Sequence, residues 1–178
     1  MGYFSKMTGI TYSPPRVSGS EVFWSWIGAF LGISAVGHLH YNVLGDADLM
    51  LIVGSFGASA VLIYGAIKSP LAQPRNLVGG HLISACIGVA SYQLFEPHLW
   101  LAAAVAVATA IAAMHLTKTL HPPGGATALI AVIGGPKIHG LGYFYALMPV
   151  GVGALIMLVV ALLVNNIPKS RQYPEFWW

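Results

Sequence analysis

The sequence predicts an all-α membrane protein of about six membrane helices, arranged as an inverted repeat of three plus three. Three observations predict this fold class: the scarcity of charge, the spacing of the apolar runs and an internal repeat. Hydrophobic residues make up 57% of the 178-residue chain and charged residues only 7%, whereas an average soluble domain carries roughly 25% charged residues. The 8 basic and 5 acidic residues are too few to coat a water-exposed surface, which excludes a soluble domain.

Six charge-free apolar runs divide the chain. Five of them approach the ~20 residues that a spanning helix needs, namely 23–44, 49–67, 77–95, 99–117 and 143–165. The sixth run, 122–135, has 14 residues and covers only about 21 Å as a helix. It is therefore expected to be a short, broken or re-entrant segment. The expected organisation is a polar N-terminal tail (1–20), a transmembrane domain (21–167) and a C-terminal tail (168–178).

The basic residues predict the orientation of the chain. If all six runs cross the membrane, seven of the eight basic residues lie on the same side as both termini, and only Lys137 lies opposite. Cytoplasmic loops carry an excess of Lys and Arg, so both termini are expected to be cytoplasmic. Nucleic acid is not an expected partner, because no basic cluster is denser than Lys169-Ser-Arg171.

An internal repeat relates the two halves of the chain, ~20–95 and ~96–165. Gly57-Ala-Ser-Ala-Val-Leu62 matches Gly125-Ala-Thr-Ala-Leu-Ile130 at three identical and three conservative positions. A unit of three crossings returns in the opposite orientation, so the halves would be related by an axis in the membrane plane. Such inverted repeats are typical of transporters and channels. The alternative is a chance likeness between helices that are rich in small residues.

Residues 121–130 read His-Pro-Pro-Gly-Gly-Ala-Thr-Ala-Leu-Ile. This motif resembles the signature of the HPP family of small integral membrane proteins, and the resemblance extends over residues ~20–165. It implies a compact multi-span domain. Members of that family in cyanobacteria and plant plastids are associated with nitrite transport. The resemblance therefore implies a transporter or channel for a small inorganic anion, with nitrite as the expected substrate, in a cyanobacterial-type inner membrane or a plastid envelope.

The same residues predict an anion site without the resemblance. Two prolines favour a helix start, and the following N–H groups at its positive end attract negative charge. The Gly-rich start in the first half adds hydroxyl groups. The expected substrate-binding residues are His121, Pro122, Pro123, Gly124, Gly125, Ala126, Thr127, Ser55, Gly57 and Ser59. In the alternative interpretation, Pro-Pro-Gly-Gly is a tight kink whose small residues allow close helix packing.

Four histidines lie within the apolar runs, His38, His40, His81 and His115. Polar groups in hydrocarbon are costly and usually face the protein interior or a water pathway. His38 and His115 occupy matching places in the two halves, so gating or proton relay is assigned to His38, His40 and His115, together with Lys118. Two other interpretations of the histidines remain open: structural hydrogen bonding, and a haem or metal site in a membrane redox protein. A non-transporting structural or regulatory subunit is the third alternative for the whole chain.

Other features restrict the function further. The single cysteine, Cys86, allows no intrachain disulfide and matches no zinc motif. No acidic residue lies within an apolar run, so an enzyme that uses paired carboxylates is not expected. No cofactor and no bound metal are expected. Small-residue faces such as Gly28-x-x-x-Gly32 predict helix contacts, and their abundance predicts a homo-oligomer, a dimer first.

Overall fold

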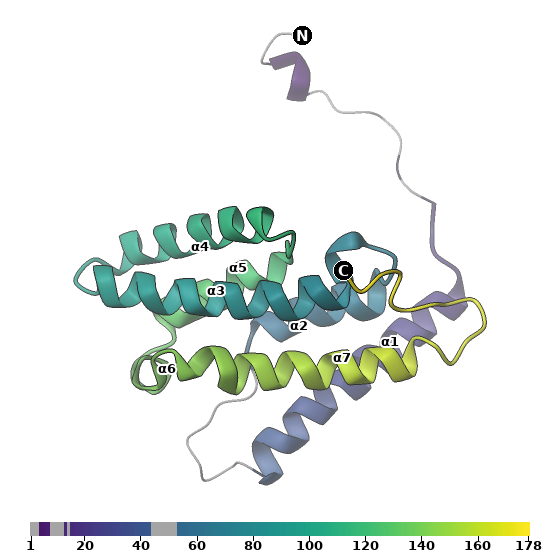
Figure 1. The fold of residues 1–178 in the computed structure, drawn as a ribbon. Helices are drawn as coiled ribbons and strands as arrows, with labels where there is room; N and C mark the ends of the chain where they lie inside the picture. Colours follow the sequence, from purple (N-terminus) through teal and green to yellow (C-terminus); the bar gives the residue numbers. More distant parts are fainter. Residues whose placement is uncertain (1–3, 8–12, 14, 44–52) are drawn as a thin grey trace.

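The computed structural model describes residues 4–7, 13, 15–43 and 53–178, and every regular element in these ranges is helical (Figure 1). The all-α prediction is therefore confirmed. Four helices are long and apolar enough to cross a membrane, namely Gly19–Asn42, Pro74–Phe95, Leu99–Leu116 and Ala146–Val164. Two shorter apolar helices, Ser55–Gly65 and Pro122–Ile133, follow the first and the third of them along the chain. A short 3-10 turn, η1 (Phe4–Met7), lies in the N-terminal tail.

The apolar run 49–67 does not form the long helix expected from its length. Within it the structure has α2 (Ser55–Ala60) and its π-helical continuation η3 (Val61–Gly65), while residues 49–52 lie outside the described part. The helix ends because Ala66 leaves the helical region, with φ −135° and ψ 50°. A hydropathy run counts apolar side chains but does not show where the backbone stops being helical.

The run 122–135, in contrast, forms the short helix that was expected. This helix, α5 (Pro122–Ile133), has 12 residues and begins with both prolines at its first two positions. Proline fits there because its missing N–H would be unpaired in the first turn anyway. The predicted helix start is confirmed.

Helix α1 (Gly19–His38) packs along α7 (Val152–Val164) and η3. Two glycines of α1, Gly28 and Gly32, are buried against the ring of Tyr64. A Cβ at Gly28 would lie 2.6 Å from Cδ1 of Tyr64, closer than carbon atoms approach, so only glycine lets the aromatic ring lie flat on the helix. The predicted contact face of α1 is thus confirmed.

Helix α3 (Pro74–Phe95) belongs to the other group, in which α3, α4 (Leu99–Leu116) and α5 all pack on one another. One face of α4 carries alanines at four-residue spacing, Ala102, Ala106 and Ala110, all without exposed surface. Small side chains at this spacing bring helix backbones close together, as is usual between membrane helices. Helix α3 is therefore covered by other helices on several sides, so polar side chains on it can be buried inside the bundle.

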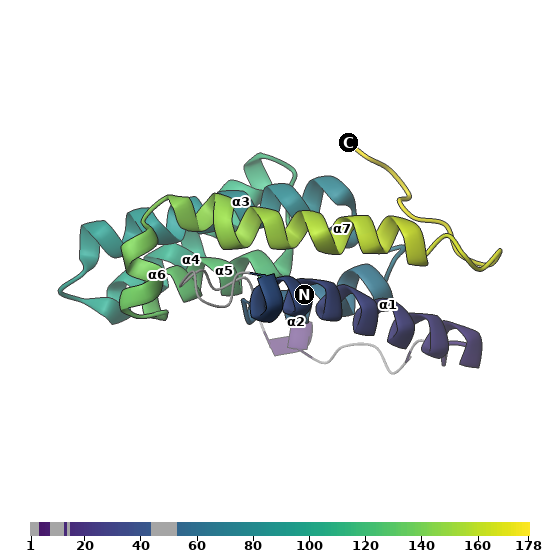
Figure 2. The ribbon, with the colours of Figure 1, turned by 90° about the horizontal axis from the view of Figure 1, so that it is seen from below.

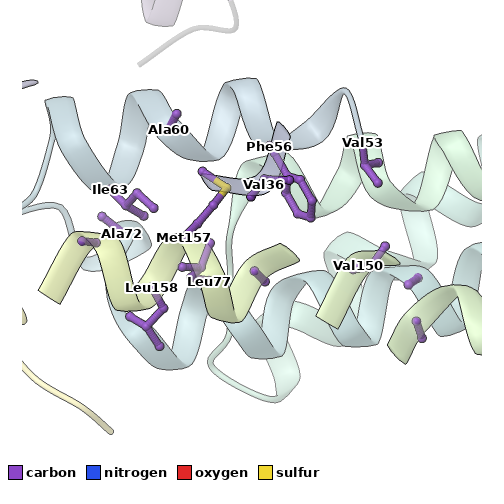
Figure 3. Packing of buried hydrophobic residues seen from close by; sticks show 14 of the residues in the cluster. Val36, Val53, Phe56, Ala60, Ile63, Ala72, Leu77, Val150, Met157 and Leu158 are labelled. Atoms are coloured by element: carbon purple, nitrogen blue, oxygen red, sulfur yellow. The ribbon is translucent and has the colours of Figure 1, made fainter. Parts of the chain in front are cut away.

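The two groups of helices meet in an apolar core. Figure 3 shows Phe56 of α2 beside Val36 of α1, with Met157 of α7 close by, and these three side chains have at most 1% of their surface exposed. The chain enters α7 through α6 (Pro136–Leu141) and the π-helical segment η5 (Ala146–Gly151). Figures 1 and 2 show α3, α4 and α7 along a similar direction, whereas α1 crosses α7 obliquely in the view of Figure 1.

The start of α1 and the C-terminal tail meet at one end of the bundle, called here the terminal end. Arg171, which follows α7, reaches Glu21 in the first turn of α1 with an Nη2–Oε2 distance of 2.9 Å. The guanidinium also donates to the Tyr64 carbonyl at 3.0 Å, so η3 ends there too. Arg75 at the start of α3 donates to the carbonyl of Thr117, after α4. The helical segments of the described chain thus alternate in direction.

The last residues, 165–178, form an irregular strap across the terminal end (Figure 1). The hydroxyl of Tyr173 donates to the Ala72 carbonyl at 2.7 Å, and the backbone N–H of Glu175 donates to Gln73 Oε1 at 2.8 Å. Burial raises the pKa of the Tyr173 phenol, so it remains protonated and keeps donating at physiological pH. The strap therefore holds the 66–73 loop in place.

Candidate functional site

Five buried polar side chains form one continuous series of hydrogen bonds inside the bundle, called here the polar chain: Ser55, Ser59, His81, His121 and Thr127. Each has 0% exposed surface. Oγ of Ser59 lies 2.9 Å from Nε2 of His121 and 2.7 Å from Nε2 of His81. The other ring nitrogen of His81, Nδ1, lies 2.7 Å from Oγ1 of Thr127. Oγ1 of Thr127 in turn lies 2.8 Å from Oγ of Ser55.

The direction of these hydrogen bonds follows from a single backbone group. Nδ1 of His121 lies 2.8 Å from the carbonyl oxygen of Leu71, and a carbonyl can only accept, so this nitrogen carries a hydrogen. In the neutral ring the other nitrogen then accepts from the Ser59 hydroxyl. Oγ of Ser59 accepts in turn from Nε2–H of His81. Nδ1 of His81 is left to accept from the Thr127 hydroxyl, which assigns both histidine tautomers.

Four segments of the chain contribute to the polar chain. Ser55 and Ser59 are four residues apart on α2, which places both on one face of that helix. His81 comes from the second turn of α3, where the edge of its ring meets Phe56 at a centroid distance of 5.4 Å. His121 precedes α5 and Thr127 lies within it. The polar chain therefore joins the two short helices through α3.

A glycine of α3 allows His121 to approach. A Cβ at Gly80 would lie 2.6 Å from Cβ of His121 and 2.8 Å from the carbonyl oxygen of Thr119. Any side chain there would push the segment before α5 away from α3. The rings of His81 and His121 would then separate from their present centroid distance of 5.0 Å. Gly80 thus lets the segment before α5 approach α3 closely enough for His121 to join the polar chain.

Comparison with known proteins places the chain in a family. The family described as HPP, transmembrane region, matches residues 14–174. The chain belongs to the HPP transmembrane family. It is 48% identical over 179 residues to one transmembrane protein of Dictyostelium discoideum and 44% identical over 181 residues to a second one, in each case over 99% of this chain. It spans 57% and 63% of the length of these curated relatives. No solved structure matches the chain.

In this HPP chain, four predicted site residues come together: His121, Thr127, Ser55 and Ser59 all belong to the polar chain. The carbonyl of Pro123 also contributes, since Oγ1 of Thr127 lies 3.3 Å from it. His81 was not among the predicted site residues, although it links the hydroxyls of both halves. The only sequence signal for it was a histidine inside an apolar run, which three other histidines share.

Gly124 of the HPP motif has different surroundings from those expected of an open anion cradle. The N–H of Gly124 donates to the His121 carbonyl at 2.8 Å. A Cβ at Gly124 would lie 2.7 Å from Oγ of Ser84 and 3.0 Å from the Gly80 carbonyl oxygen. Of the two roles that the sequence left open, the geometry at Gly124 is that of close helix packing.

The remaining predicted binding residues lie on the outer side of the two short helices. Pro122, Gly125 and Ala126 line an apolar groove of about 560 Å³ beside α4. Pro122 and Ala126 also line a second groove of about 380 Å³ beside α2. Gly57 is exposed, with no atom within 4 Å of the place where a Cβ would be. These four residues do not contact the polar chain through any side-chain hydrogen bond.

The residues predicted for gating or proton relay lie apart from the polar chain. His38 and His40 are at the far end of α1, where Nδ1 of His38 is 3.2 Å from Nδ2 of Asn42 and the His40 ring meets Tyr41. His115 and Lys118 are exposed near the end of α4. In this arrangement the structure does not bring the four together.

The histidines of the polar chain are poorly arranged for haem or metal. Both nitrogens of His81 and of His121 already have hydrogen-bond partners within the protein, so a metal would have to displace a serine, a threonine or a carbonyl. Among the described residues, no group of three or more His, Cys, Asp or Glu side chains is placed to hold a metal ion.

Proposed function

We propose that this HPP chain is a membrane transport protein for a small inorganic anion, with nitrite as the first substrate to test. The observation that carries the proposal is the polar chain itself. Two imidazoles and three hydroxyls are buried inside a bundle whose long helices are apolar enough to cross a membrane. Polar groups at such depth are costly and in membrane proteins usually line the path of a substrate or ion.

The arrangement of the helices supports a 3+3 inverted repeat. If α1, α2–η3 and α3 correspond to α4, α5 and α7, every main packing pair has its counterpart. Helix α1 packs on α7 and on η3, as α4 packs on α3 and on α5; α3 packs on α5, as α7 packs on α2 and η3. Matching helices run in opposite directions. Short helices that meet near such an axis commonly form the substrate site of transporters.

The polar chain follows the same symmetry. Ser59 and Thr127 occupy equivalent positions in the sequence repeat, and they bond the two nitrogens of one ring, His81. A small anion needs a few donors that hold it weakly enough for release. We propose that hydroxyl and imidazole N–H groups of the polar chain supply these donors by exchanging their present partners for the anion, while Gly124 allows the helices to pack closely around them.

The test is anion uptake into proteoliposomes that contain the purified chain. A panel of nitrite, nitrate, formate and chloride should show uptake of at least one anion above that of protein-free liposomes, with nitrite preferred. The double variant Ser55→Ala/Thr127→Val should lose most of this uptake. Ser91→Ala, which alters another buried serine on α3, serves as the matched control and should retain it.

Two results would overturn the proposal. One is an uptake rate equal to that of protein-free liposomes for every anion on the panel, in protein that elutes as a single folded species. The other is normal uptake by the double variant, because transport would then not depend on the polar chain.

A further inference from the structure

We infer that His81, Ser59 and His121 form a relay that carries one proton, so that anion movement is coupled to proton movement. This inference rests on the proposed transport function and adds the coupling ion. It starts from the position of Ser59, whose single hydroxyl lies between Nε2 of one ring, at 2.7 Å, and Nε2 of the other, at 2.9 Å. A hydroxyl can accept one proton while it releases another, so it can link two imidazoles.

The first supporting observation is that the neutral state gives a partner to every ring nitrogen of His81 and His121 and to the Ser59 hydroxyl. Nδ1–H of His121 donates to the Leu71 carbonyl, and the Ser59 hydroxyl donates to Nε2 of His121. Nε2–H of His81 then donates to Ser59. The Thr127 hydroxyl donates to Nδ1 of His81, and Oγ of Ser55 lies 2.8 Å from Oγ1 of Thr127.

The second observation is that one added proton also leaves every member satisfied. If the proton binds Nδ1 of His81, the Thr127 hydroxyl must turn away. It has two other acceptors within reach, Oγ of Ser55 at 2.8 Å and the Pro123 carbonyl oxygen at 3.3 Å. The imidazolium of His81 then donates from both nitrogens, to Ser59 and to Thr127.

The proton can then move between the rings with all atoms balanced. Nε2 of His81 gives its proton to Oγ of Ser59, and the same oxygen gives its original proton to Nε2 of His121. His81 is left neutral with its hydrogen on Nδ1, and His121 becomes the imidazolium. Ser59 ends with one hydrogen that now points back to His81. The positive charge has crossed from one ring to the other without any heavy atom moving.

A second proton breaks this arrangement. With both rings charged, both Nε2–H groups would donate to Oγ of Ser59. The hydroxyl hydrogen of Ser59 would then lack a side-chain acceptor, because both of its partners have become donors. Two like charges 5.0 Å apart between ring centroids also repel. The relay therefore carries one proton at a time.

No charged side chain on the helices around the two rings takes part in this proton exchange. Helices α2, α5 and α7 contain no charged residue. On α3, the guanidinium of Arg75 is bonded to the Thr117 carbonyl, and on α4 His115 is exposed. The hydroxyl of Tyr145 donates to the Thr127 carbonyl and that of Tyr64 to the Met157 carbonyl. A charge in such apolar surroundings is unfavourable, which suits transfer rather than storage of the proton.

The direct test is nitrogen-15 NMR of the histidine rings in the full chain in liposomes, with assignments from His81→Asn and His121→Asn. On acidification, Nδ1 of His81 should gain a full hydrogen, and the two Nε2 atoms should show intermediate shifts because they share one proton. In Ser59→Ala the sharing should disappear, leaving one charged and one neutral ring. Ser84→Ala, which alters a buried serine of α3 that donates to Sδ of Met114, should behave like the wild type. Unshared Nε2 signals in the wild type would overturn the relay.

The functional test follows anion uptake and internal pH together in proteoliposomes, with protein-free liposomes subtracted. One proton should move with each anion in the wild type, and proton movement should fall on the order of 100-fold in Ser59→Ala. Ser59→Cys keeps nearly the same volume and should also lose most of it, which guards against a misfolded alanine variant. Ser84→Ala should keep it.

The two proposals fail in different ways. Anion uptake without proton movement, in protein whose Nε2 signals are unshared, overturns the relay and leaves the transport function standing. Shared Nε2 signals in protein that takes up no anion overturn the transport function and leave the relay standing.

Discussion

Gly124 and Gly125 are adjacent in the chain but have opposite surroundings. A Cβ at Gly124 would meet Ser84, Gly80 and Met114 at 2.7 to 3.0 Å, whereas a Cβ at Gly125 would have only Val107 nearby, at 3.9 Å. Both lie in the first turns of α5, so alanine improves their helix propensity equally. The two positions form a matched pair that separates packing from backbone hydrogen bonding to an anion.

We expect Gly124→Ala to destabilise the protein by about 1–3 kcal/mol, because added atoms in a packed interior force backbone shifts. Gly125→Ala should be neutral or slightly stabilising. The midpoint of thermal unfolding in detergent measures both. If Gly125→Ala lowered the unfolding midpoint as much as Gly124→Ala, the assignment of Gly124 alone to helix packing would be wrong.

Thr127 supports two buried partners at once, Nδ1 of His81 and Oγ of Ser55. Thr127→Val keeps the shape but leaves both without this partner, and a buried unsatisfied polar group costs about 1–3 kcal/mol. We expect a lower unfolding midpoint for Thr127→Val and a smaller change for Thr127→Ser, which keeps the hydroxyl. Thr109→Val, at an exposed position on α4, is the control. Equal midpoints for Thr127→Val and Thr109→Val would contradict the hydrogen-bond assignment.

At the scale of elements, the strap 165–178 depends on one buried arginine. The side chain of Arg171 is 1% exposed and pairs with Glu21. It also donates to the Asn165 side chain, to Oγ of Ser25 and to the Tyr64 carbonyl. Two of these partners belong to α1 and one to η3, so a single guanidinium joins three segments that are distant in sequence.

We expect Arg171→Ala to cost roughly 2–3 kcal/mol, since it leaves several charge-assisted hydrogen bonds unmade. Arg171→Lys should recover only part of this, because an ammonium lacks the planar fork of donors that reaches partners on several sides. Lys169→Ala, exposed on the same strap, should have little effect. Thermal unfolding of the three variants is the measurement, and full recovery by lysine would show that charge alone suffices.

At the scale of the whole molecule, the contact between Arg171 and Glu21 places both tails at one end of the bundle. The loops at that end contain Lys68, Lys118 and Lys169, whereas Lys137 lies on α6 near the opposite end. This distribution supports the proposal that the terminal end is cytoplasmic, because basic residues are enriched in cytoplasmic loops.

Cysteine labelling from one side of the membrane tests this topology in a Cys86→Ser background. Ser13→Cys and Ser170→Cys should react only from the cytoplasmic side. Gly140→Cys, exposed on α6 with open space around it, should react only from the other side. If Ser13→Cys and Ser170→Cys reacted from opposite sides, the two tails would not lie on the same side of the membrane. If all three cysteines reacted from one side, α6 would lie on the same side as the terminal end, and the predicted topology would be wrong.

The sequence alone determined the all-α membrane class, the short helix at Pro122 and four members of the polar chain, including His121 and Thr127. These features are local. Apolar composition, prolines in a first turn and hydroxyls in matched repeats each indicate the structure of their own segment, so they can be recognised from neighbouring residues alone. The extent of the 49–67 helix was overestimated for the same reason, since hydropathy does not record where the backbone leaves the helix.

Tertiary structure decided what depends on which helix faces meet. His81 bonds Ser59, 22 residues away, and Thr127, 46 residues away, and no pattern near His81 distinguishes it from the other intramembrane histidines. Gly124 is a packing residue only because α3 passes it. The burial of Arg171 depends on a partner 150 residues earlier. Contacts of this kind are set by the packing of whole helices, because the same side chain would face lipid, water or another helix according to how its helix is rotated and placed.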